Sequence, residues 1–220
     1  MQATAILPVK RFSRAKTRLA DAVGPPARAA LMRAMLTDVL RAVSETSAIE
    51  RTIVVTGESR AQKVALSVAQ RVSMPIEVMQ DPDDPGHSQA ATLGIIRALA
   101  LGAECAALLP GDCPLLDAGE LDAALARSEP GTVAVIPDRH GTGTNGLLMA
   151  PADAIGPAFG EGSRERHLDR AARAGYATRV EELSSLALDL DTPDDLAALR
   201  VWIADHPEAA PETARALAEQ

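Results

Sequence analysis

The chain has 220 residues, of which 47% are hydrophobic and 24% charged, and its formal net charge is −8. These are ordinary globular values, so the composition excludes a wholly disordered chain, and the negative charge argues against a protein that coats nucleic acid. No apolar run approaches the roughly 20 residues that cross a bilayer, and the N-terminus lacks a signal-peptide pattern. Two cysteines exclude a disulfide scaffold. Together these features predict a cytoplasmic protein that binds neither nucleic acid nor membrane.

Strand and helix patterns alternate along the first 136 residues. Short apolar runs bounded by Gly or Pro predict strands, and apolar residues at helical spacing predict helices. The predicted strands are 3–9, 52–56, 76–80, 106–109 and 132–136. The predicted helices are 26–44, 59–71, 88–101 and 120–127. This alternation predicts an α/β, Rossmann-like fold of three layers, in which helices cover both faces of a mostly parallel central sheet.

The remainder of the chain is less regular. The pattern predicts loops at 138–145 and 157–163, strands at 146–150, 178–180 and 186–190, and a helix at 164–174. Thr192 followed by Pro193 and two acids predicts the start of a helix that runs to about Ala204. We expect a single domain of residues 1–204, followed by a helical or frayed tail at 205–220.

Cations gather directly after the first predicted strand. Lys10, Arg11, Arg14, Lys16 and Arg18 place five positive charges within nine residues. Because ligands of open α/β sheets bind beyond the carboxyl ends of the strands, this segment suits a polyphosphate, with a solvated charged loop as the alternative. The Gly-x-x-x-x-Gly-Lys frame of a P-loop is absent.

Three aspartates also follow predicted strands. Asp112 stands in a Pro-Gly-Asp-Cys-Pro turn after the fourth strand, whereas Asp189 and Asp191 alternate along strand 186–190 and would share one face. Carboxylates are good ligands for Mg²⁺, so the three together could hold one or two ions, with turn and helix capping as the alternative. Cys113 is interpreted as a buried filler rather than a nucleophile.

Two Gly-rich loops, 141–145 and 159–163, offer backbone N–H groups and hydroxyls to an anion, although two ordinary turns are the alternative. Ser163 opens the predicted helix, so its N–H and hydroxyl can both point at an oxyanion. His167 lies one turn further along the same helix face, where it either touches the same ligand or lies on the surface. His87 and His140 are loop residues without the partners of a catalytic triad.

Five motifs resemble, in the same order, the phospholactate guanylyltransferase family, called CofC in archaea and FbiD in actinobacteria. They are LPVK…AKTRL at 7–19, LLPGDCPLL at 108–116, GTGTN at 141–145, FGEGS…H at 159–167 and LDLDTPDDL at 188–196. The resemblance implies a GT-A type, MobA-like nucleotidyltransferase fold. It also implies transfer of GMP from GTP to a small phosphorylated carboxylic acid, with release of pyrophosphate, in coenzyme F-420 biosynthesis. The acceptor in this family is phosphoenolpyruvate, 2-phospho-L-lactate or 3-phospho-D-glycerate.

The resemblance implies roles for individual residues as well. It makes Asp112, Asp189 and Asp191 the ligands of Mg²⁺, and we expect Lys16 and Asp112 to carry catalysis. The residues that would bind the acceptor are Thr144, Asn145, Gly160 and Ser163. The residues that would bind the nucleotide are Leu7, Pro8, Val9, Lys10, Lys16, Arg18, Gly86 and Ser88.

The family's Gly-x-Asn-Ala-like stretch is replaced here by Gly-His-Ser-Gln-Ala-Ala at 86–91, which leaves the base preference open. Two alternative functions also stay open at this point. A cytidylyltransferase or sugar-phosphate nucleotidyltransferase of the same fold would carry a Leu-x-Ala-Gly-Gly loop, which is absent. A non-catalytic nucleotide-binding protein is disfavoured by the three aspartates and both Gly-rich loops. The sequence also leaves room for a homodimer.

Overall fold

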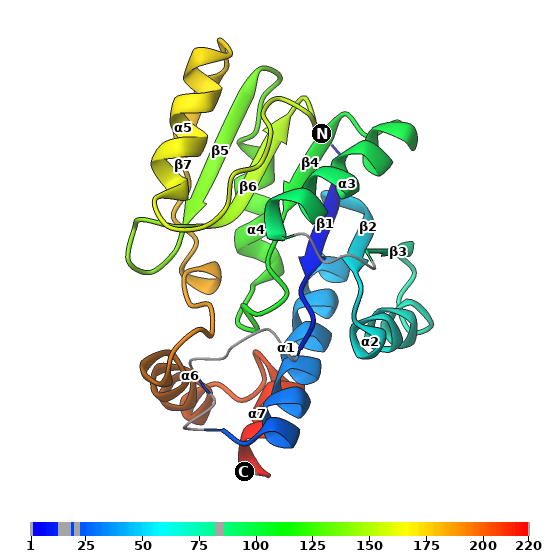
Figure 1. Cartoon of the computed structure of the whole chain (residues 1–220), viewed down its shortest axis with the longest axis vertical. Coiled ribbons are helices and arrows are strands. Elements are labelled where there is room, and N and C mark those ends of the chain that lie inside the picture. Colours follow the sequence, from blue (N-terminus) through cyan, green and yellow to red (C-terminus); the bar gives the residue numbers. More distant parts are fainter. Residues whose placement is uncertain (1, 13–18, 20–22, 82–85, 220) are drawn as a thin grey trace.

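The computed structural model describes residues 2–12, 19, 23–81 and 86–219 and contains a seven-stranded sheet (Figure 1). The strands are β1 (Ala3–Val9), β2 (Ile49–Thr56), β3 (Ile76–Gln80), β4 (Cys105–Leu108), β5 (Thr132–Pro137), β6 (Thr144–Ala150) and β7 (Ala177–Val180). Their order in the sheet is β3-β2-β1-β4-β6-β5-β7. All neighbours are parallel except β6, which runs antiparallel to both β4 and β5. The predicted α/β fold with a mostly parallel sheet is confirmed.

Helices cover both faces of the sheet, as predicted. They are α1 (Pro25–Glu45), α2 (Ser59–Ala69), α3 (His87–Ala100), α4 (Ala118–Ala126), α5 (Ser163–Arg173), α6 (Pro193–Asp205) and α7 (Pro211–Ala218). Side chains of α3 and α5 pack in one core cluster, and those of the other five helices pack in a second. Successive residues of a strand point to opposite faces, so Leu7 of β1 joins the second cluster while its neighbour Ile6 joins the first. None of the described helices is long and apolar enough to cross a membrane.

Two expectations about local structure were wrong. Residues 186–190 do not form a strand: a 3₁₀ turn at Ser184–Leu186 is followed by irregular chain. The carbonyls of Leu186 and Ala187 accept hydrogen bonds from the side chain of Asn145 instead of a neighbouring strand. In addition, Thr144 and Asn145 belong to β6 rather than to the preceding loop, because the hairpin with β5 extends to a pairing of Thr144 with Pro137.

The C-terminal segment includes a helix that packs on the body of the molecule. Thr213 and Ala216 of α7 are buried, and α7 contacts α1 extensively. The buried carboxylate of Asp38 on α1 accepts the backbone N–H groups of Glu212 and Thr213, at 3.2 and 2.8 Å. Asp38 therefore caps the first turn of α7 from another part of the chain.

We expect Asp38→Ala to lower the free energy of unfolding by about 1–3 kcal/mol, because two N–H groups at the start of α7 lose a charged acceptor. Urea unfolding measures this loss, and faster amide exchange should be concentrated in residues 211–218. The exposed Asp153→Ala is the matched control and should change neither quantity. Equal stability of the two variants would contradict the capping role.

Candidate active site

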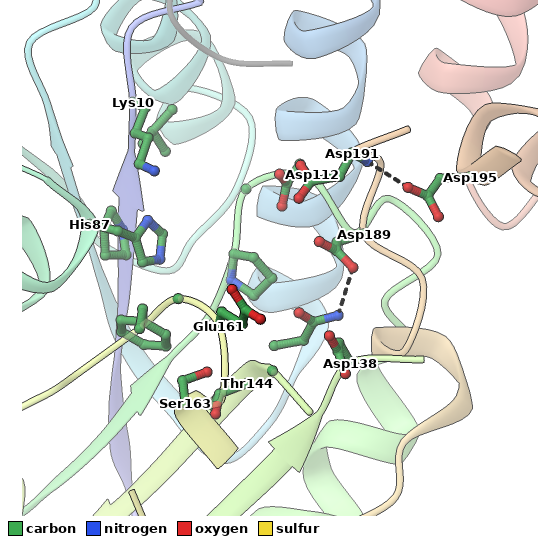
Figure 2. Close-up of a pocket in the computed structure, with 18 of the residues that line it drawn as sticks. Lys10, His87, Asp112, Asp138, Thr144, Glu161, Ser163, Asp189, Asp191 and Asp195 are labelled. Atoms are coloured by element: carbon green, nitrogen blue, oxygen red, sulfur yellow. Dashed lines mark hydrogen bonds between the residues drawn. The ribbon is translucent and has the colours of Figure 1, made fainter. Parts of the chain in front are cut away.

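A cavity of about 850 Å³ opens where β1 and β4 end at their carboxyl termini. Its walls come from five parts of the chain, namely 8–12, 87–88, 110–112, 138–163 and 189–195, with Met32 and Leu36 of α1 beneath. In Figure 2, Asp112 and Asp191 lie toward one end of this cavity, Thr144 and Ser163 toward the other, and Glu161 between them. The cavity thus occupies the sheet edge at which the sequence predicts a ligand.

The residues predicted to bind the nucleotide divide into three groups. Pro8, Val9, Lys10 and Ser88 line the cavity. Leu7 is fully buried in the core, and Gly86 is the N-cap of α3; neither is among the lining residues. Lys16 and Arg18 lie outside the described residues, as does Arg14. The roles of all these residues in nucleotide binding stay predictions.

The three predicted metal ligands, Asp112, Asp189 and Asp191, all line the cavity (Figure 2). The N–H of Leu190 donates to the carbonyl of Asp112 at 3.4 Å and joins the two segments that carry them. The side-chain amide of Asn145 donates to the Leu186 carbonyl at 2.9 Å and lies 3.3 Å from Oδ1 of Asp189. The aspartates therefore meet at one cavity through side-chain and turn contacts rather than through alternation on a strand.

A capping network fixes the turn that carries Asp191. Oδ2 of Asp195 accepts the N–H groups of Asp191 and Thr192 at 3.0 and 2.6 Å, and Thr192 Oγ1 accepts the N–H of Asp195. The predicted N-cap at Thr192 is confirmed as a full capping box. Arg139 adds an ion pair of 2.6 Å to Oδ1 of Asp195. Sequence reasoning missed Arg139, because no local pattern links it to a carboxylate so far along the chain.

The donor set fits Mg²⁺ by its chemistry, because carboxylate oxygens are the hard ligands that this ion prefers. Among the residues that the structure describes, however, no three His, Cys, Asp or Glu side chains stand close enough together to hold a metal ion as they are. Six of the lining residues carry carboxylates: Asp112, Asp138, Glu161, Asp189, Asp191 and Asp195. Within the described lining, Lys10 is the one lysine or arginine. Any phosphorylated ligand would need further positive charge here.

The predicted acceptor residues Thr144, Asn145, Gly160 and Ser163 all line the same cavity. Ser163 is 1% exposed, and its Oγ is buried without a hydrogen-bond partner in the described structure. Its N–H is already bonded to the carbonyl of Gly160 at 3.0 Å, so the expectation that N–H and hydroxyl both face a ligand was wrong. Gly160 has φ 110°, a conformation that residues with a Cβ rarely adopt, which explains the glycine at this turn.

His167 is fully buried and lies behind the cavity wall rather than on the surface. Its Nε2 accepts the N–H of Ala158 at 2.8 Å, its Nδ1 is 3.0 Å from Oγ1 of Thr144, and its ring meets Phe159 edge-on at 5.2 Å. Burial, together with the positive charges of Arg170 and Arg166, lowers the pKa of His167 to about 4. The imidazole is therefore neutral at physiological pH.

The start of α3 contacts the second Gly-rich loop directly. Ser88 Oγ accepts the N–H of Phe159 at 3.0 Å, and the ring of His87 meets that of Phe159 edge-on at 4.7 Å. A segment predicted to contact the nucleotide thus supports a segment predicted to contact the acceptor. Sequence reasoning did not find this link, because Ser88 and Phe159 are far apart along the chain.

The lowered pKa of His167 predicts that the protein loses stability in mild acid. The unfolded chain takes up a proton near pH 6.5 but the folded chain only near pH 4, so the contribution is complete above 6.5 and is lost as the pH falls toward 4. Between pH 7 and pH 5 the wild type should lose about 2 kcal/mol more of unfolding free energy than His167→Gln. Urea titrations at both pH values measure this. An equal pH dependence in the wild type and His167→Gln would contradict the assignment.

The sequence matches known proteins over nearly its whole length. The family described as "Guanylyl transferase CofC like" matches residues 3–208. A protein of Conexibacter woesei named phosphoenolpyruvate guanylyltransferase is 43% identical over 215 residues, which cover 97% of this chain and 94% of the relative. A protein of Sphaerobacter thermophilus with the same name is 36% identical over 196 residues, covering 89% and 91%.

Solved structures share the fold at lower identity. A nucleotidyl transferase of Methanothermobacter thermautotroptrophicus superimposes with a TM-score of 0.67 at 18% identity, covering 93% of this chain and 98% of the other. A putative nucleotide-diphospho-sugar transferase of Desulfovibrio desulfuricans gives 0.71 at 19% identity, covering 100% and 95%. These likenesses show a nucleotidyltransferase fold, and the family match goes further: the chain belongs to the CofC-like guanylyl transferase family.

Proposed function

We propose that this protein is a phosphoenolpyruvate guanylyltransferase, which transfers GMP from GTP to phosphoenolpyruvate and serves coenzyme F-420 biosynthesis. The names of the relatives from Conexibacter woesei and Sphaerobacter thermophilus support the choice of acceptor. One observation carries the placement of that acceptor. The hydroxyl of Ser163 is buried and without a partner in the described structure. Ser163 stands at the start of α5 and lines the same cavity as Asp112, Asp189 and Asp191. A phosphate or carboxylate oxygen would supply the missing partner.

The reaction follows from the charges of the two substrates. An oxygen of the acceptor's phosphate attacks the α-phosphorus of GTP, the bond from that phosphorus to the bridging α–β oxygen breaks, and its electron pair leaves with pyrophosphate. The product links GMP and the acceptor through a phosphoric anhydride. Because the attacking phosphate is already ionised at neutral pH, no general base is needed, and the protein has to position the substrates and offset their charge.

Different groups of residues bind the triphosphate, the acceptor and the metal ion in this proposal. Lys10, Lys16 and Arg18 hold the triphosphate after β1, while Thr144, Asn145, Gly160 and Ser163 hold the acceptor. Asp112, Asp189 and Asp191 would hold Mg²⁺, which when bound offsets the phosphate charge and favours displacement at the α-phosphorus. The carboxylates of the cavity support the proposed cation, since without added positive charge they would repel two anionic substrates.

The function is tested by incubating the pure protein with GTP, Mg²⁺ and one acceptor at a time, and following pyrophosphate. We expect release with phosphoenolpyruvate and a guanylylated product by mass spectrometry. Parallel reactions with 2-phospho-L-lactate, 3-phospho-D-glycerate and with CTP in place of GTP test acceptor and base preference. Release with CTP and none with GTP would overturn the proposal. A cytoplasmic location and a homodimer stay predictions from sequence, and light scattering on the eluted protein tests the second.

Asp112→Asn should lower kcat by roughly 10²–10³-fold, because a charged group that acts at the transition state becomes neutral while the side chain keeps its size. The pyrophosphate assay measures the loss, and urea unfolding should show an unchanged fold. Asp169→Asn is the matched control, since Asp169 is an exposed residue on the outer side of α5. Near-normal turnover by Asp112→Asn at any Mg²⁺ concentration would contradict the metal assignment.

Ser163→Ala should raise the KM for the acceptor about ten- to a hundredfold, the range expected when a charged oxygen loses one hydroxyl donor. The KM for GTP should stay nearly constant, because Ser163 lies toward the end of the cavity away from Asp112 and Asp191, where we propose that the acceptor binds (Figure 2). Ser73→Ala, in an exposed turn, is the control for a lost hydroxyl elsewhere. A weakened GTP interaction with unaltered acceptor dependence would overturn this placement.

A further inference from the structure

His167 is a polar side chain that the proposed reaction does not use, although it is completely buried directly behind the acceptor end of the cavity. It joins two elements that both carry acceptor-binding residues. One nitrogen bonds to the hydroxyl of Thr144 on β6, and the other bonds to the N–H of Ala158 in the loop that leads to Gly160 and Ser163. A side chain in this position can control how Thr144 and the loop at 158–163 are oriented toward a ligand.

The bond to Ala158 settles where the imidazole carries its proton. A backbone N–H can only donate, so Nε2, which lies 2.8 Å from the nitrogen of Ala158, must be the unprotonated acceptor. The neutral ring then carries its hydrogen on Nδ1, which donates to Oγ1 of Thr144 across 3.0 Å. Burial and the charges of Arg170 and Arg166 lower the pKa of His167, which keeps the ring neutral, as the acceptor role of Nε2 requires.

This tautomer sets the direction of the Thr144 hydroxyl. A hydroxyl has one hydrogen to donate, and Oγ1 already accepts from His167, so the hydrogen of Thr144 is left for a partner on the cavity side. A ligand with a charged oxygen is the partner that such a donor suits. The opposite tautomer would turn Thr144 into a donor to the histidine and offer the ligand only lone pairs.

We propose that His167 is a positioning residue for the acceptor: by accepting from Ala158 and donating to Thr144, it aims the Thr144 hydroxyl hydrogen at a charged oxygen of the phosphorylated acid. This inference rests on the proposed function and adds to it a residue that does not itself touch the ligand. Three arginines of α5 hold the same loops independently of His167. Arg164 donates to the carbonyl of Gly141, Arg166 to that of Ala158 and Arg170 to that of Gly156. Variants at His167 should therefore fold.

Three substitutions separate the two hydrogen bonds. His167→Asn can keep a donor near the Nδ1 position, His167→Gln can keep an acceptor near the Nε2 position, and His167→Phe keeps neither. We expect the KM for phosphoenolpyruvate to rise about ten- to a hundredfold in the Phe and Gln variants and clearly less in the Asn variant. The KM for GTP should change less than about threefold in all of them. Full rescue by Gln and none by Asn would overturn the role of Thr144.

A second variant tests whether His167 acts through Thr144. Thr144→Val keeps the size of the side chain but removes the hydroxyl, so the Asn and Phe variants of His167 should then have the same KM for the acceptor. A difference that persists in the Thr144→Val background would contradict the proposal. The exposed His206→Phe controls for loss of a histidine and should leave both Michaelis constants unchanged.

A spectrum separates failure of this inference from failure of the proposed function. Long-range ¹H–¹⁵N correlation at pH 7, with His167 assigned by its absence in His167→Asn, should show a protonated Nδ1 and an unprotonated Nε2. A proton on Nε2, or on both nitrogens, overturns the inference whatever the activity.

If the wild type releases no pyrophosphate with GTP and any acceptor, the proposed function fails, and titration calorimetry with phosphoenolpyruvate decides the inference instead. Weaker binding by His167→Phe than by His167→Asn then supports it, and equal or absent binding overturns it.

Discussion

The site depends on two neighbouring residues at the start of β6 that point to opposite faces of the sheet. Thr144 reaches the α5 side, where it bonds to His167, and Asn145 reaches the other side, where it holds the carbonyls of Leu186 and Ala187 and lies beside Asp189. The alternation of a strand makes this division automatic. One dipeptide thus ties the loop at 158–163 on one face, through His167, and the segment at 186–189 on the other, and both segments reach the same cavity.

The charges of the cavity explain why these ties are needed. Five aspartates and Glu161 line the cavity, and carboxylates repel one another. The backbone bond from Leu190 to Asp112, the capping box of Thr192 and the ion pair from Arg139 to Asp195 hold the segments in place against that repulsion. A cavity lined by this many carboxylates must be stabilised by bonds from the surrounding structure.

Those helices and strands whose signals lie within a few consecutive residues could be predicted well from the sequence. The predicted bounds of β1 and β3 agree with the observed strands, Ala3–Val9 and Ile76–Gln80, and the Thr192 cap follows from a four-residue pattern. The prediction of a strand at 186–190 was wrong, because strand formation also depends on a pairing partner that lies elsewhere in the chain. Alternating Leu and Asp satisfy a period of two, yet no neighbouring strand offers this segment a ladder, and a side chain of β6 takes its carbonyls. His167 was misjudged in the same way, because burial behind β6 is a property of the assembled layers.

Gly146, which follows Thr144 and Asn145, leaves room for the close packing of β6 against two neighbouring side chains. At Gly146 a Cβ would stand 2.6 Å from Cδ1 of Ile136, which is closer than side chains approach, and 3.0 Å from Cδ2 of Leu186, which is a very tight contact. Leu186 is fully buried and its carbonyl is held by Asn145, so it has little room to withdraw. A larger residue at 146 would therefore strain the packing of β6 against Ile136 and against the segment that leads to Asp189. This glycine acts through packing on the segment that leads to Asp189, although it lies next to Thr144 and Asn145.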